Sequence, residues 1–265
     1  MGTEHHDTDS FRGATFRRVD LSGASFREVD LSRVTVRDSD VRGLRIVASM
    51  VDDVHLSGHE GVGRVVVDDV EVTEYVRAEL DRRHPERIGA RDARTAAALR
   101  AAWAEVDHLW DVAVADAARL PESRLHERVH DEWSFVETMR HLVFAVDGWV
   151  GRMLGGTSAP YHPWGLPPTD ATEAAAAEMG LDLAATPGCV AVADVHRQRR
   201  QSVTAELAGV TDEALSEVRR GVLSPEWGEE SFPVLDCLRT VLREHAEHLR
   251  FALRDLAELA RNDGD

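Results

Sequence analysis

A bulky apolar residue recurs at every fifth position in the N-terminal part of the chain. The ten positions keep strict register: Phe11, Phe16, Leu21, Phe26, Leu31, Val36, Val41, Ile46, Val51 and Leu56. A period of five fits neither the 3.6-residue turn of an α-helix nor the two-residue repeat of a β-strand. It fits a coil with four flat sides, in which each pentapeptide forms one side and points its bulky side chain inward. The pattern therefore predicts a short solenoid of about two and a half turns.

This register resembles the pentapeptide-repeat family, whose members fold as right-handed quadrilateral β-helices. Some members imitate DNA and bind topoisomerases, and a DNA mimic needs a dense surface of one charge. Residues 1–60 contain 11 acidic residues against eight arginines, a balance of only −3. We therefore favour a docking or dimerisation scaffold over a DNA mimic. Dimerisation through the repeats would give a homodimer.

The segment after the repeats is expected to cap the solenoid. Residues 65–72 predict a β-hairpin, and Thr73 is a candidate N-cap for a helix that runs to about Arg83. We expect both to pack on the last rungs, because an open coil exposes strand edges. Residues 84–90 break the helical periodicity and mark the expected domain boundary. The predicted division has three parts: repeats at 1–60, a cap and linker at 61–90, and a helical domain at 91–265.

Four long amphipathic segments follow, at about residues 95–120, 134–154, 190–207 and 231–261. Ser134 and Glu137 form a capping box at the start of the second. Each segment carries an apolar stripe, so a four-helix bundle is predicted. The Gly- and Pro-rich connection at 155–188 is long enough to line a pocket. The expected fold class is thus α+β multidomain: a short right-handed quadrilateral β-helix followed by an all-α four-helix bundle.

Charge and composition exclude several classes of protein. A net charge of −17 argues against a chain that binds nucleic acid or an anionic membrane. No apolar run approaches the roughly 20 residues that span a bilayer, so we expect a cytoplasmic protein. All 31 basic residues are arginine, which excludes lysine Schiff-base chemistry and is typical of a GC-rich genome such as an actinobacterium's. Cys189 and Cys237 indicate no disulfide framework, and we expect both to be inert packing residues.

Helix faces in the bundle bring together side chains that can bind a metal. Glu244 and His248 are four residues apart, so both project from one face of the last helix. His245 fills a gap in the neighbouring apolar seam, and His141 lies beside the seam of the second helix. A histidine there can also be a hydrogen-bonded core residue, and Glu244 a solvated carboxylate. Two imidazoles and a carboxylate on facing surfaces favour a metal, because burying them without a shared partner is costly.

The runs Trp133-Ser134 to His141-Leu142 and Glu244 to His248, followed by Arg250-Phe251, resemble the DinB/YfiT-like superfamily. Within it, they are most similar to the mycothiol-dependent maleylpyruvate isomerase type, common in actinobacteria. Those proteins are four-helix bundles that bind a divalent metal. The resemblance implies His141, Glu244 and His248 as ligands here, with His245 as an alternative to Glu244. It implies zinc first, with nickel, iron or manganese as other choices.

The same resemblance implies the chemistry. A metal-bound thiol is deprotonated at neutral pH, and in this superfamily the thiol is a small molecule such as mycothiol. We therefore expect a metal-dependent thiol S-transferase or isomerase acting on an electrophilic substrate, with the catalytic nucleophile supplied by the cofactor and not by a side chain. The rival interpretation is a non-catalytic metal-binding module for interaction or stress response, with the repeats as a docking scaffold. An open coordination position facing a pocket favours the enzyme.

Further pocket candidates come from the long connection and the third helix. His162 and Trp164 either line the pocket mouth or form a Pro-bounded turn whose tryptophan packs on the bundle. Arg197 and Arg200 either meet an anionic substrate or lie solvated on the helix surface. Trp133 and Trp227 are expected as hydrophobic anchors. The sequence has no phosphate-binding glycine-rich motif, and no nucleotide site is predicted.

Overall fold

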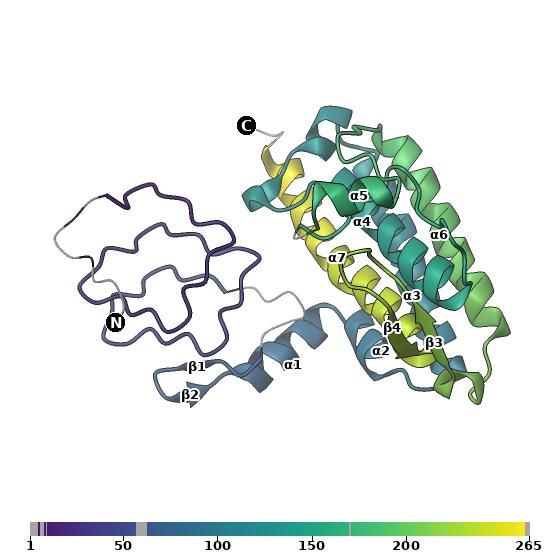
Figure 1. Ribbon diagram of the computed structural model, residues 1–265, viewed down its shortest axis with the longest axis horizontal. Coiled ribbons are helices and arrows are strands. Elements are labelled where there is room, and N and C mark those ends of the chain that lie inside the picture. The colour runs from purple at the N-terminus through teal and green to yellow at the C-terminus, as the bar shows by residue number, and fades with distance from the viewer. Residues whose placement is uncertain (1–4, 6–7, 9, 57–62, 170, 263–265) are drawn as a thin grey trace. The chain divides into compact units, whose positions relative to one another are not determined.

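The computed structural model describes residues 5, 8, 10–56, 63–169 and 171–262. Its contacts divide the chain into two compact units, residues 1–45 and 46–265. The first unit holds most of the repeats, and the second holds the helices (Figure 1). The boundaries expected at residues 60 and 90 stay predictions. None of the described helices is long and apolar enough to cross a membrane.

The repeats adopt a backbone with a five-residue period. A left-handed φ recurs every five residues, at Gly13, Arg18, Gly23, Glu28, Arg33, Asp38, Gly43, Ala48 and Asp53. The turn hydrogen bonds repeat every ten residues, from the amide of Ala14 to Phe11 O and from that of Ala24 to Leu21 O. Residues 10–56 contain no assigned strand. The period predicted from the sequence is therefore present in the turns, whereas the β-helix is not confirmed.

The bulky side chains of the repeats are not buried, contrary to expectation. The ten positions from Phe11 to Leu56 are between 45% and 62% exposed. A coil of so few turns gives each rung few neighbouring rungs to cover its side chains, and a repeat protein gains its core only from stacking. The repeats therefore expose an apolar row at five-residue spacing.

The hairpin after the repeats is confirmed, but the helix cap differs from the expectation. Strands β1 (Val66–Val67) and β2 (Val70–Glu71) pair antiparallel. Helix α1 spans Thr73–Arg83, and its N-cap is Val72. The Thr73 hydroxyl does not cap the helix, because it accepts a hydrogen bond from the Val65 amide at 3.0 Å and donates one to Gly63 O at 3.3 Å.

Residues 84–90 are not an irregular linker. They lead into a short helix, α2 (Glu86–Asp92), which packs on α3 and α7. Gly89 allows the close approach, since a Cβ there would lie 2.9 Å from Ala102 Cβ of α3. The break in periodicity reflects a helix of about two turns, which is too short to show an apolar stripe.

The predicted four-helix bundle is present. Its helices are α3 (Ala96–Ala117), α4 (Phe135–Val146), α6 (Cys189–Gly209) and α7 (Val234–Asn262). Helices α3 and α4 each pack on both α6 and α7. Thr95 caps α3, and Ser134 and Glu137 form the expected capping box of α4. The largest fully buried core residues include Trp110, Phe135, Leu99, Met139, Leu142, Leu238, Leu242 and Leu249.

Several smaller elements were not expected. Helix α4 continues as a π-helix, η3 (Asp147–Leu154). Strands β3 (Val218–Gly221) and β4 (Glu230–Pro233) form a hairpin, so the last helix begins at Val234 and not at Ser231. Helix α5 (Glu173–Glu178) lies across α4, where Ala176 contacts Phe144 (Figure 1). Three short 3₁₀ helices complete the fold: η1 (Glu122–His126), η2 (Val129–Asp131) and η4 (Ala214–Ser216).

Arg140 of α4 joins the long connection to the bundle. Its side chain, 5% exposed, donates to three backbone carbonyls of the connection. The donor–acceptor distances are 2.8 Å to Trp164 O, 2.7 Å to Ala185 O and 3.0 Å to Asp182 O. The Arg140 carbonyl in turn accepts from the Leu166 amide at 3.1 Å. Both ends of the connection are thereby held against α4.

Two histidines lie fully buried in the bundle core. The rings of His196 (α6) and His245 (α7) stack with centroids 5.4 Å apart, and Trp110 and Trp103 pack on them edge-on. His245 Nδ1 donates to Val241 O at 2.8 Å. His245 Nε2 and both His196 nitrogens are buried without a hydrogen-bond partner among the described residues. Burial lowers the pKa of both groups, to about 3 for His245.

Replacing Arg140 with lysine should loosen the long connection. A lysine cannot serve three separated carbonyls in the fixed geometry of a guanidinium, and each buried carbonyl left unsatisfied costs about 1–3 kcal/mol. Hydrogen exchange at the amides of Leu166 and Asp182 should therefore accelerate by tenfold or more. Arg197→Lys, which changes a half-exposed side chain paired with Asp194, is the matched control. Equal exchange in the two variants would contradict the role assigned to Arg140.

Removing His196 should reduce the acid sensitivity of the fold. Its pKa in the folded protein lies well below its ordinary value of 6.5, so below that pH the unfolded chain binds a proton that the folded one does not. Stability is therefore lost as pH falls, by about 1.4 kcal/mol per unit for each such group. From pH 7 to pH 5, the free energy of unfolding of His196→Leu should fall by about 2 kcal/mol less than that of the wild type. Urea unfolding measures this difference, which should vanish between pH 7 and pH 8.

Candidate metal site

Three side chains predicted as ligands converge between α4 and α7. His141 projects from α4, while Glu244 and His248 project from successive turns of α7. Their potential ligand atoms all lie within 4.8 Å of one another. Glu244 Oε2 is 3.5 Å from His141 Nε2 and also 3.5 Å from His248 Nδ1. The side chains are between 8% and 16% exposed, so the group is shielded and still reachable.

Backbone carbonyls determine which nitrogen of each histidine carries the proton. His141 Nδ1 lies 3.0 Å from Leu166 O, and His248 Nδ1 lies 2.9 Å from Glu244 O. A carbonyl oxygen only accepts, so Nδ1 donates in both rings, and in the neutral form of each ring the lone pair is then on Nε2. This second hydrogen bond is the usual companion of a metal-ligating imidazole, because it fixes the tautomer and the ring orientation.

The spacing of the donor atoms suits a small divalent ion. Zinc bonds to nitrogen and carboxylate oxygen at about 2.0–2.2 Å, and a tetrahedral arrangement then places neighbouring donors about 3.4 Å apart. The 3.5 Å between His141 Nε2 and Glu244 Oε2 matches that value. The described residues bring three potential ligands together here, and a tetrahedral ion held by them would have one further position, as in catalytic zinc sites. The residues therefore fit a metal, although the identity of the metal is not determined by them.

Aromatic rings surround the three side chains. Trp133 packs on the His141 ring at 4.5 Å and stacks with the His248 ring at 6.1 Å between centroids. Phe144 and Phe251 lie 6.4 Å from His141 and 6.3 Å from His248. Such rings exclude water and strengthen electrostatic interactions inside the site.

Sequence reasoning missed two of these contacts. Trp133 was expected only as a hydrophobic anchor, yet it contacts both histidines. Its position next to the capping box of the helix that carries His141 was the signal available for it. The Leu166 carbonyl had no such signal, because a residue in an irregular connection gives no periodicity to follow.

His245 does not join the group. Although it neighbours Glu244 in sequence, its ring lies between Trp103 and His196 on the side of α7 that faces α3 and α6. Successive residues of a helix point about 100° apart, so His245 and Glu244 cannot share one small site. The alternative in which His245 replaces Glu244 is not supported by this placement.

The long connection contributes a carbonyl to the site, whereas its aromatic candidates have other contacts. His162 Nδ1 accepts a hydrogen bond from the Trp164 amide at 3.1 Å, and Trp164 packs against the bundle core. This is the Pro-bounded turn anticipated as one of two outcomes. A role for His162 or Trp164 in lining a pocket mouth stays a prediction.

The candidate arginines of α6 are both paired with carboxylates. Arg197 is half exposed and bonds to Asp194 at 2.6 Å. Arg200 is buried, and it bonds to Asp107 and, at 2.6 Å, to Asp111 of α3. Arg200 thus lies inward and not solvated on the surface. Binding of an anionic substrate by either residue stays a prediction.

Both cysteines are poor nucleophiles in this structure. Cys189 and Cys237 are buried free thiols. Burial raises the pKa of Cys189 to about 11 and that of Cys237 to about 12, so both are protonated at neutral pH. This agrees with the inert packing role expected from the sequence.

Comparison with known families identifies two regions of the chain. The family described as pentapeptide repeats (8 copies) matches residues 10–43. The DinB superfamily matches residues 98–252, which include His141, Glu244 and His248. No curated protein and no solved structure matches the chain. Because the second match covers more than half of the sequence, the chain, with pentapeptide repeats at its N-terminal end, belongs to the DinB superfamily.

Proposed function

We propose that this protein is a divalent-metal-dependent thiol S-transferase or isomerase that activates a small thiol of the mycothiol type. The observation that carries the proposal is the convergence of His141, Glu244 and His248, whose donor atoms lie within 4.8 Å of one another. Three protein ligands would leave a tetrahedral ion one position for an exogenous ligand. A bound divalent ion supplies Lewis acidity, which lowers the pKa of a coordinated thiol into the neutral range. Zinc is our first choice, with nickel, iron or manganese as alternatives.

The chain's own residues would hold and orient the reacting groups. His141 and His248 would each present Nε2, since their Nδ1 protons are donated to Leu166 O and Glu244 O. Glu244 would add one negative charge, which limits the net charge of a dication site. Trp133 would exclude water from one side of the group, because it packs on both imidazole rings.

The nucleophile is proposed to come from a cofactor for a chemical reason. Cys189 and Cys237 are the only cysteines of the chain, and burial keeps both protonated at neutral pH. A small-molecule thiol would instead supply the sulfur nucleophile, reaching side chains that are 8–16% exposed. Low-molecular-weight thiols of this kind are cytoplasmic, so we also propose a cytoplasmic protein.

A second candidate function is a non-catalytic metal-binding module that docks through its repeats. It is favoured by the exposed apolar row, whose ten side chains are 45–62% exposed. We propose that these repeats stack into a right-handed quadrilateral β-helix, supported by the left-handed φ at every fifth residue. The apolar side chains that so short a coil leaves exposed would provide the surface for a docking partner or a second copy of the chain.

The metal content of variants tests the ligand set. Wild-type protein should contain about one divalent ion per chain, and His141→Ala and His248→Ala should each reduce this at least tenfold, because each removes one of three ligands. His245→Gln should retain the ion and lose only stability. Phe26→Asp, in the repeats, should also retain it. Elemental analysis after gel filtration measures these contents. Equal metal contents in the wild type and both ligand variants would contradict the assigned site. If the Phe26→Asp variant contains no metal, the repeats and the bundle form one functional unit.

Turnover distinguishes the two candidate functions. Metal-loaded protein should accelerate the reaction of mycothiol with 1-chloro-2,4-dinitrobenzene or the isomerisation of maleylpyruvate, and His141→Ala should lose at least 100-fold in kcat/KM. Cys189→Ala is the control and should retain the rate, since its thiol is not the proposed nucleophile. Bacillithiol and glutathione in place of mycothiol define the thiol class. A protein that holds its ion and accelerates none of these reactions would support the non-catalytic module.

A further inference from the structure

The two imidazoles of the candidate metal site are oriented by different parts of the chain. His248 Nδ1 donates to Glu244 O, four residues earlier in the same helix, so α7 alone orients that ring. His141 Nδ1 donates instead to Leu166 O, 25 residues away in the long connection. The orientation of His141 therefore depends on a tertiary contact, and whatever holds Leu166 in place also holds the ligand.

Leu166 is bound to α4 through both of its backbone polar groups. Its amide donates to Arg140 O at 3.1 Å, and its carbonyl accepts from the side chain of the next helix residue, His141, at 3.0 Å. Two bonds to successive residues of one helix leave Leu166 little freedom to move. The Asp182 amide donates to Pro163 O at 2.7 Å, so the two arms of the connection are also joined to each other.

Gly165 allows the connection to approach α4 this closely. A Cβ there would lie 3.1 Å from His162 O, 3.1 Å from Leu181 Cδ2 and 3.4 Å from Phe144 Cβ. The first two distances are shorter than ordinary van der Waals contact. Gly165 does not have a left-handed φ, so the requirement for glycine is steric. Phe144 stacks with the His141 ring, and a side chain at position 165 would therefore press on the surroundings of the ligand.

The Leu166 carbonyl acts against a competing arrangement of the site. Without it, the neutral His141 ring could carry its proton on Nε2, which lies 3.5 Å from Glu244 Oε2. That distance is slightly beyond the usual N–H···O range of about 2.7–3.2 Å, so a small rotation would form a charge-assisted hydrogen bond. The bond would engage both the nitrogen and the oxygen that a metal requires. Because Leu166 O needs a proton on Nδ1, it disfavours this tautomer.

We propose that the long connection is a positioning element for the metal site, in which Gly165 brings the Leu166 carbonyl onto His141 and so keeps Nε2 available as a ligand. This role rests on the proposed metal site. One hydrogen bond belongs both to the ordered connection and to the ligand-competent ring, so metal binding and ordering of the connection strengthen each other by the same factor. Contacts of this kind behind a ligand usually change metal affinity about 10–100-fold.

Nitrogen-15 NMR of the histidine rings in the metal-free full chain at pH 8 tests the tautomer. Wild-type His141, whose signals are identified by their loss in His141→Gln, should carry its proton on Nδ1. Gly165→Ala should shift the tautomer ratio toward Nε2–H about fivefold, the effect of one lost hydrogen bond. Gly209→Ala is the matched control, because its added Cβ would have no atom within 4 Å. A proton on Nε2 in the wild type would overturn the proposal, whether or not the protein binds a metal.

Zinc titration against a competing chelator tests the effect on the ligand. Gly165→Ala and Arg140→Lys should each bind zinc at least tenfold more weakly than the wild type, and Gly209→Ala should bind it equally well. Bound zinc should also slow hydrogen exchange of the wild-type Leu166 amide more than that of the Trp227 amide, which bonds to Ser224 O in the turn between β3 and β4.

The outcomes separate this role from the proposed function. Circular dichroism checks folding, and if Gly165→Ala is unfolded, Arg140→Lys decides both measurements. Wild-type zinc affinity in the folded variants would overturn the positioning role and leave the metal site intact. Failure of the wild type to bind zinc, nickel, iron or manganese would contradict the proposed function, and the tautomer results alone would then decide the role of the connection.

Discussion

The three hydrogen bonds from Arg140 to the long connection are the interaction on which the candidate site depends. Burying a guanidinium is costly unless its donors are satisfied, and the carbonyls of Trp164, Asp182 and Ala185 satisfy them together. The same arrangement places Leu166 O within 3.0 Å of His141 Nδ1, one residue further along α4. The buried Arg140 therefore both holds the long connection against α4 and helps to orient the His141 imidazole.

Arginine suits this role because its guanidinium binds several acceptors at once, and the chain uses arginine for all its basic residues. Every one of the 31 basic residues is arginine. Its planar fork binds several acceptors at once, whereas an ammonium acts as a point charge. Arg140 uses the fork on three carbonyls, and Arg200 uses it on two carboxylates of α3. The bundle thus joins its helices and connections through multidentate contacts that lysine would not make.

Regular features of this fold were predictable from the sequence, whereas contacts between non-periodic segments were not. Periodicity and the capping box placed the four helices within a few residues and brought Glu244 and His248 to one face of α7. The π-helix, the β3–β4 hairpin and the role of Thr73 depend on tertiary partners distant in sequence, so local pattern did not reveal them. The repeats show the same limit, because their period predicted the turns and not the exposure of Phe16 or Phe26.

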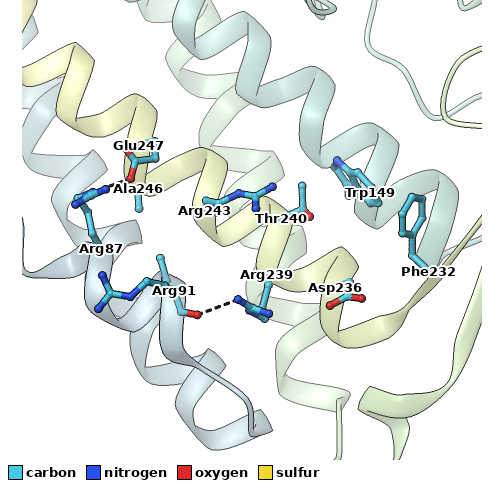
Figure 2. A pocket seen from close by; sticks show the side chains of 11 residues that line it. Arg87, Arg91, Trp149, Phe232, Asp236, Arg239, Thr240, Arg243, Ala246 and Glu247 are labelled. Carbon is cyan, nitrogen blue, oxygen red and sulfur yellow. Dashed lines mark hydrogen bonds and ion pairs between the residues drawn. The ribbon is translucent and has the colours of Figure 1, made fainter. Parts of the chain in front are cut away.

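Helix α7 shows how one element can serve a core and two separate surfaces. Over Val234–Asn262 it buries Leu238, Leu242 and Leu249 in the bundle. Because each residue turns the helix by about 100°, the pairs Arg243/Glu247 and Glu244/His248 are adjacent in sequence and yet face different neighbours. The first pair meets α2, through the contact of Glu247 with Arg87 (Figure 2), and the second meets His141 of α4. The 3.6-residue period therefore directs the two pairs toward different neighbours, although they share the same turns of helix.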